Sequence, residues 1–184
     1  MPLPQPAERE PIQTRQIEIS SFYRQDGLWD VEGRLVDVAA VSIKNYTGGI
    51  IKAGDPIHDM RLRLTLDSSV EIVGVDVCME AHPYPLCPGI VPAYQQLKGE
   101  TIGHGWNRRI RELFGGVGGC VHVVDLLGLV GTLGFKTVIR ESGQDDAAPE
   151  DRKDDKPYQV NTCHALASNG EIVRDRWPEL YTGN

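Results

Sequence analysis

The chain has 184 residues, of which 40% are hydrophobic, and its formal net charge is -7. This length predicts one domain with enough apolar side chains for a sizeable core. No basic stripe with interleaved aromatic residues is present, which argues against a nucleic-acid partner. No charge-free apolar run reaches about 18 residues, which argues against a membrane span.

The first residues, MPLPQPAEREP, contain no apolar signal core, so the cytoplasm is the expected location. In that compartment the four cysteines are expected to be reduced thiols rather than disulfides. Their spacing does not form the paired C-x-x-C pattern of a zinc ribbon. They stand at positions 78, 87, 120 and 163.

The N-terminal half alternates apolar and polar residues with period two, which predicts half-buried strands. Residues 15–22 and 28–43 form a predicted hairpin with its turn at Asp26-Gly27. Gly33 indicates a bulge or a close approach of the backbone to a neighbour. The clearest strand is 57–67, and 70–81 returns as its partner. In that strand one face is predicted to hold Met60, Leu62, Leu64 and Leu66, and the other Arg61, Arg63 and Thr65.

After Ala81 the spacing changes from that of strands to that of helices. The proline-rich stretch 82–89 is expected to be irregular, because each proline fixes φ and removes a backbone donor. Short helices are predicted over 90–99 and 106–114, and a buried helix over about twenty apolar residues from Cys120. The glycines between the last two helices predict a turn, with Cys120 buried after it.

Strands first and helices later predict an α+β fold, in which an antiparallel sheet from the N-terminal half is backed by helices from the C-terminal half. Residues 1–13 are expected to form a flexible arm, and 14–140 the α+β domain. The stretch 141–156 is rich in acidic residues and poor in large apolar ones, which indicates a linker. Residues 157–184 are expected to dock on the domain.

Several segments in order resemble a bacterial family catalogued as domain of unknown function 2889 (DUF2889). They are TRQIEI, YRQDGLWDVEGRLVD, IHDMRLRLTLD, PYPLC, LKGETIGHGWNRRIRELFGGVGGCVHVVDLL and NTCHAL. The resemblance implies aromatic catabolism, and with it a cofactor-independent lyase that releases formaldehyde from a lignin-derived phenolic dimer such as a phenylcoumaran. Val121 and Val123 replace the threonine and leucine that the family favours, so a hydroxyl at 121 is not expected to be essential.

This reaction needs a base, a proton donor and a partner for a phenolate. His58, oriented by Asp59, is the expected base, because a histidine held by a carboxylate accepts protons near neutral pH. Tyr23 is expected to protonate the leaving oxygen. Arg24 or Arg61 is expected to stabilise the phenolate, because a guanidinium is always charged. The plainer alternatives are a histidine that ends a strand and charges that solvate the sheet.

Trp29 and Tyr84 are expected to wall the aromatic rings of the substrate, with His122 reaching into the same pocket. The chain lacks dinucleotide-binding and phosphate-loop motifs, in line with a reaction that needs no cofactor. The expected partner is a small aromatic substrate, without nucleic acid or membrane, and a homo-oligomer is compatible with the sequence.

Several other interpretations remain open at this point. Cys87, Cys120 and His122 have the side-chain types of a zinc site, and Cys120 at a helix start could instead be a reactive thiol or a packed one. The chain could also be a small-aromatic binding module, or a protein like the metal and iron–sulfur scaffolds, without turnover. Metal analysis and ligand-induced thermal shifts separate these readings.

Overall fold

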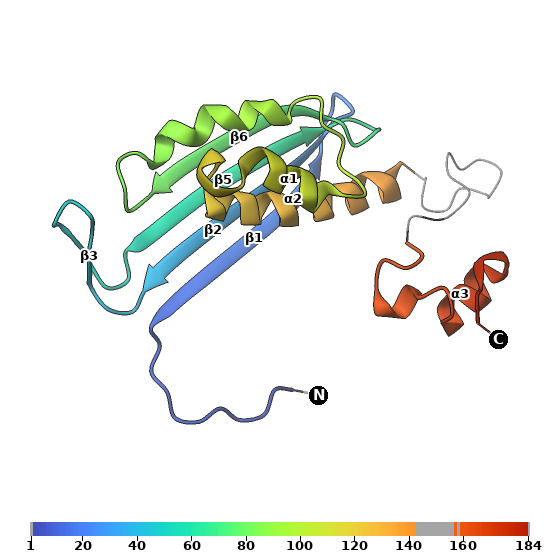
Figure 1. Ribbon diagram of the computed structural model, residues 1–184, viewed down its shortest axis with the longest axis horizontal. Helices are drawn as coiled ribbons and strands as arrows, with labels where there is room; N and C mark the ends of the chain where they lie inside the picture. Colours follow the sequence, from blue (N-terminus) through green and yellow to red (C-terminus); the bar gives the residue numbers. More distant parts are fainter. Residues whose placement is uncertain (1, 143–156, 158, 184) are drawn as a thin grey trace. The chain divides into compact units, whose positions relative to one another are not determined.

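The computed structural model describes residues 2–142, 157 and 159–183 (Figure 1). The chain divides into two compact units, Met1–Val138 and Ile139–Asn184. Most of the predicted linker lies outside the described residues, and docking of the C-terminal segment stays a prediction. Residues 2–12, most of the predicted arm, are exposed and precede the first strand.

The larger unit contains a four-stranded antiparallel sheet in the order β1-β2-β5-β6 (Figure 1). The four predicted strands are present, although the second ends at Ala39 rather than at residue 43. The predicted turn is confirmed, and Gly27 there has a φ of 84°. With the helices that follow, this sheet confirms the α+β class. The strands are β1 (Gln13–Tyr23), β2 (Trp29–Ala39), β5 (Pro56–Leu66) and β6 (Ile72–Ala81).

The connection from β2 to β5 forms a second, two-stranded sheet of β3 (Ile43–Lys44) and β4 (Ile50–Ile51). The sequence predicts a loop for most of this connection. The side chain of Asn45 organises the turn instead, because its carbonyl oxygen accepts hydrogen bonds from the backbone amides of Thr47 and Gly49.

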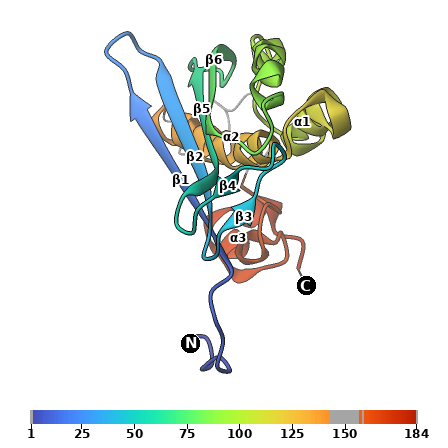
Figure 2. The ribbon, with the colours of Figure 1, turned by 90° about the vertical axis from the view of Figure 1, so that its left-hand side faces the viewer.

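Two α-helices and a long 3₁₀-helix follow the sheet: η1 (Cys87–Leu97), α1 (Trp106–Phe114) and α2 (Val121–Glu141). The predicted helix over 90–99 begins earlier than expected, because Pro88 occupies the first turn, where a missing amide is tolerated. Predictions for the other two helices are confirmed. The helix α2 lies along one face of the sheet (Figure 2).

The core lies between α2 and the sheet. Leu35, Met60 and Leu64 are fully buried on the strands, as are Leu126 and Val130 on α2. A β-carbon on residue 33 would lie 2.7 Å from a methyl group of Val130, which confirms the predicted close approach at that glycine. The other face of the sheet is open and charged.

The glycine-rich segment before α2 is a tight turn that joins α1 to α2. It contains the short 3₁₀-helix η2 (Gly116–Gly118), and Gly116 has a φ of 60°, which favours glycine. A β-carbon on Gly119 would lie 2.5 Å from the carbonyl oxygen of Phe114. Close packing therefore accounts for the glycines. Cys120 is half-buried rather than buried as predicted.

Glycines inside α2 let α1 approach it closely. The indole nitrogen of Trp106 donates to the carbonyl oxygen of Leu127 at 3.0 Å, and a β-carbon on Gly131 would overlap that indole. We expect Gly131→Val to lower the free energy of unfolding by about 1–3 kcal/mol through overpacking. Urea denaturation measures it. Gly103→Ala is the control, because nothing lies within 4 Å of its β-carbon position, and an equal loss in both variants would contradict the expectation.

Among the described residues, α2 is the one helix that is long and apolar enough to span a membrane, although half of its apolar stretch is buried in the structure. A core helix meets the same criterion, so this finding leaves the expected absence of a membrane partner a prediction.

The smaller unit contains α3 (Glu171–Arg176), η4 (His164–Leu166) and η5 (Pro178–Leu180), with Val173 and Trp177 buried.

Candidate functional site

Three side chains from different elements meet at one end of the sheet: Asp37 on β2, His58 on β5 and His122 on the first turn of α2. Asp37 and His58 are paired across the strands, and Arg15 on β1 is paired with Asp37 on the other side. Paired residues on neighbouring strands point to the same face. The register therefore places Arg15, Asp37 and His58 in one row beneath the start of α2.

The carboxylate of Asp37 lies at the centre of this row. Its Oδ2 is 3.0 Å from Nδ1 of His58 and 3.5 Å from Nε2 of His122. The centroids of the two imidazole rings are 3.8 Å apart. Because Nδ1 of His58 is held by the carboxylate, the Nε2 atom is the ring nitrogen that remains for another partner.

Arg15 compensates the charge of Asp37, whose side chain is only 1% exposed. Its Nε donates to Oδ1 at 2.7 Å and its Nη2 donates to Oδ2 at 2.9 Å. This two-pronged bond lowers the pKa of Asp37, despite the opposing effect of burial. Arg15 also lies 3.4 Å from Asp125 on α2, so it connects the strand row with the helix.

Burial lowers the pKa of both histidines. For His58 the hydrogen bond to Asp37 opposes this effect without overcoming it. For His122 the neighbouring His58 and Arg15 lower the pKa further. Both rings are therefore neutral near pH 7, and a neutral imidazole oriented by a carboxylate is a group that can accept a proton.

Cys120 borders the cluster on the helix side. Its Sγ lies 3.7 Å from Nδ1 of His122, and its backbone amide donates to the hydroxyl of Tyr94 at 2.8 Å. Burial raises the pKa of Tyr94 to about 12, so this hydroxyl stays protonated. The thiol thus lies beside the outward nitrogen of His122, away from the carboxylate.

The cluster also has the side chains of a metal site. The ligand atoms of Asp37, His58 and His122 all lie within 4.8 Å of one another. Among the described residues these three form the one group of histidine, cysteine or acidic side chains that could hold a metal ion. The sequence predicts a different set as the alternative zinc site. Of that set the structure brings His122 into the group, but neither Cys87 nor Cys120.

Asp59 does not orient His58, and that prediction was wrong. Adjacent residues of a strand point to opposite faces, so Asp59 faces the open side of the sheet. There it accepts two hydrogen bonds from Arg34, at 2.9 and 2.6 Å. The carboxylate that holds His58 belongs to Asp37.

The other predicted catalytic residues lie at the far end of the sheet. Tyr23 is eight residues along β1 from Arg15, a distance of about 26 Å in an extended strand. It packs on Trp29, with ring centroids 5.0 Å apart, and Trp29 is itself 6% exposed. Arg24 binds Asp26 and Asp30. The structure therefore does not bring these residues to His58.

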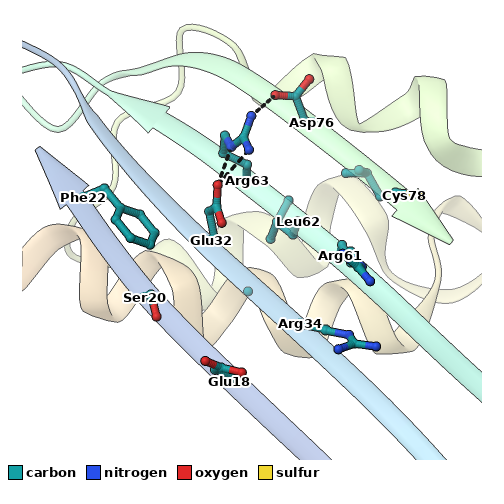
Figure 3. Close-up of a pocket in the computed structure, with 12 residues that line it drawn as sticks. Glu18, Ser20, Phe22, Glu32, Arg34, Arg61, Leu62, Arg63, Asp76 and Cys78 are labelled. Atoms are coloured by element: carbon teal, nitrogen blue, oxygen red, sulfur yellow. Dashed lines mark hydrogen bonds and ion pairs between the residues drawn. The ribbon is translucent and has the colours of Figure 1, made fainter. Parts of the chain in front are cut away.

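Arg61 lines a cavity of about 490 Å³ on the open face of the sheet, opposite α2 (Figure 3). Charged side chains that line this cavity pair with one another, since Arg63 contacts both Glu32 and Asp76. No histidine is among the lining residues. The cavity therefore offers no proton acceptor comparable with His58, and the Asp37 cluster is the better candidate for chemistry. The lining residues are Glu18, Ser20, Phe22, Glu32, Gly33, Arg34, Arg61, Leu62, Arg63, Asp76, Val77 and Cys78.

Tyr84 is the predicted ring-binding residue that lies at the same end of the sheet as the cluster. It follows the end of β6, where Ala81 pairs with Asp59. Its ring packs against Tyr46 of the β3–β4 hairpin with centroids 5.5 Å apart, and both rings are exposed. The two tyrosines therefore offer apolar ring surface near the strand ends that hold Asp37 and His58.

The comparisons with known proteins identify the family. The family model "Protein of unknown function (DUF2889)" matches residues 13–136, which include Arg15, Asp37, His58 and His122, and the chain belongs to this family. No curated protein and no solved structure matches the chain. Family membership is therefore shown without an activity.

Proposed function

We propose that this member of the DUF2889 family is a lyase that releases formaldehyde from the hydroxymethyl group of a lignin-derived phenolic dimer, such as a phenylcoumaran. The observation that supports proton transfer is the buried Asp37, which holds Nδ1 of His58, while no described residue makes a hydrogen bond to Nε2. The substrate class rests on the resemblance of the sequence motifs.

The reaction balances without a redox cofactor. The substrate phenolate expels the ether oxygen of the fused ring, which gives a quinone methide and a phenoxide that takes up a proton. The hydroxymethyl group then loses its O–H proton, and the bond between its carbon and the ring carbon of the substrate that bears it breaks. The electron pair of that bond reduces the quinone methide to a phenol, and formaldehyde and a stilbene are released.

The residues of the cluster supply the groups that this sequence of steps needs. His58 accepts the hydroxyl proton at Nε2, with Asp37 fixing the ring. His122 is the second imidazole at the same place. The leaving phenoxide takes its proton from water, and the proton that His58 accepts returns to water, so both rings are neutral again after each turnover. Arg15 is the cation of the site, and it takes over the role that the sequence suggests for Arg24 or Arg61. Tyr84 contacts an aromatic ring of the substrate.

A direct assay tests this proposal. Chelator-treated protein is incubated with a phenylcoumaran that has a hydroxymethyl group, and formaldehyde and stilbene absorbance are measured together. Equal amounts of the two products are expected, because one carbon–carbon bond yields one of each. Stabilisation by the compound in a thermal shift assay without either product would contradict the lyase and favour a binding module.

A further inference from the structure

The three ligand atoms of the cluster are spaced as neighbours around a single ion. Two ligands that bind one ion at about 2.0–2.2 Å, with angles of about 90–110°, lie about 3.0–3.5 Å apart. In the structure Oδ2 of Asp37 is 3.0 Å from Nδ1 of His58 and 3.5 Å from Nε2 of His122. All three atoms lie within 4.8 Å of one another, so one ion can reach them without movement of the backbone.

The donor types narrow the class of ion. Two imidazole nitrogens with one carboxylate oxygen suit zinc and the other divalent first-row transition metals, whereas calcium and magnesium prefer oxygen ligands. The neighbouring side chains orient these ligands as the neighbours of bound metal ions do, because Arg15 fixes the carboxylate of Asp37. On the other side Cys120 lies beside Nδ1 of His122, which leaves Nε2 to face the ion.

We propose that Asp37, His58 and His122 bind a divalent transition-metal ion such as Zn²⁺, and that the bound ion inhibits the lyase. The second part rests on the proposed function. The ion takes the lone pair of Nδ1 of His58, and the proton of the neutral ring then sits on Nε2. That nitrogen no longer accepts a proton from a substrate hydroxyl.

Two features of the site favour reversible binding over a permanent structural ion. The positive charge of Arg15, bonded to both oxygens of Asp37, opposes the approach of a cation. The imidazole rings are 3.8 Å apart, whereas two rings on one ion have centroids about 4.5 Å or more apart. The rings must therefore tilt apart when the ion binds, and the metal is expected to exchange with chelators.

Calorimetry with Zn²⁺ and the visible absorbance of Co²⁺ test the site independently of any substrate. The chain is used without a histidine tag, after chelator treatment and dialysis. We expect saturable binding of one ion per chain, weakened more than about 100-fold in both His122→Ala and Asp37→Asn, because each loses a direct ligand. His104→Ala is the matched control, since that histidine is exposed and lies outside the cluster.

The outcomes separate the two proposals. Absence of saturable binding, or binding by folded Asp37→Asn and His122→Ala that is as tight as binding by the unchanged chain, overturns the metal site whatever the lyase assay gives. Metal binding as expected, together with no formaldehyde from chelator-treated protein either with or without added Zn²⁺, leaves the site standing and overturns the proposed function. Formaldehyde release that requires added Zn²⁺ overturns inhibition, whereas release that falls as Zn²⁺ saturates the site supports it.

Discussion

Replacing His58 by alanine is expected to lower kcat/KM for formaldehyde release ~100- to 10,000-fold, the range that general acid–base groups contribute. The variant loses the imidazole that Asp37 orients through Nδ1, and with it the Nε2 atom that accepts the proton of the substrate hydroxyl. Formaldehyde release under chelator is the measurement. His58→Gln serves as a second variant, because its amide keeps a polar contact to Asp37 but cannot accept the proton as an imidazole does.

The histidine at position 104 provides the control for this experiment. His104 is exposed in the turn that precedes α1, so His104→Ala is expected to keep the activity of the unchanged chain. Circular dichroism and the Tm establish that each variant is folded. Activity within a few-fold of normal in both folded His58 variants would remove His58 as the base and would move the proton transfer to another group.

A pair of aspartate variants tests which carboxylate supports His58. Asp37→Asn is expected to lose at least ~10-fold in kcat, up to the loss seen on removing His58, because Asp37 acts through that ring. Asp59→Asn is expected to keep kcat within a few-fold, since Asp59 binds Arg34 on the opposite face. Each substitution replaces one carboxylate by an amide of the same shape.

The split between kcat and KM adds a reading that a purely structural effect would not give. Loss of orientation at His58 lowers kcat while substrate binding, and hence KM, changes less. Equal losses in Asp37→Asn and Asp59→Asn would point to general destabilisation. A loss confined to Asp59→Asn would restore the partner that adjacency in the sequence suggests.

Strand positions could be predicted because their side chains alternate. The leucines of β5 and the arginines between them define two faces, and the structure keeps both. Helix α2 could be predicted from its continuous apolar run. The β3–β4 hairpin could not, because it depends on hydrogen bonds that the side-chain oxygen of Asn45 accepts rather than on any apolar pattern.

The site was harder to predict, since it depends on register between strands. The signal for Asp37 was present: it shares the inward face of β2 with Val31 and Leu35, where a carboxylate is unexpected. The same alternation that predicts β5 also excludes a contact between His58 and Asp59. Which acid meets His58 follows only from the pairing of β2 with β5, and a single sequence does not determine that pairing.

The site is assembled from parts that are far apart in the chain: Arg15 and Asp125 are 110 positions apart and 3.4 Å apart in space. During synthesis the strands are complete long before α2 leaves the ribosome. Until then the apolar face of the sheet that α2 covers stays open, and Asp37 and His58 lack their third partner. A nascent chain whose α2 is still inside the ribosome therefore has an incomplete cluster and an exposed apolar sheet face, and exposed apolar surface of this kind is prone to aggregation.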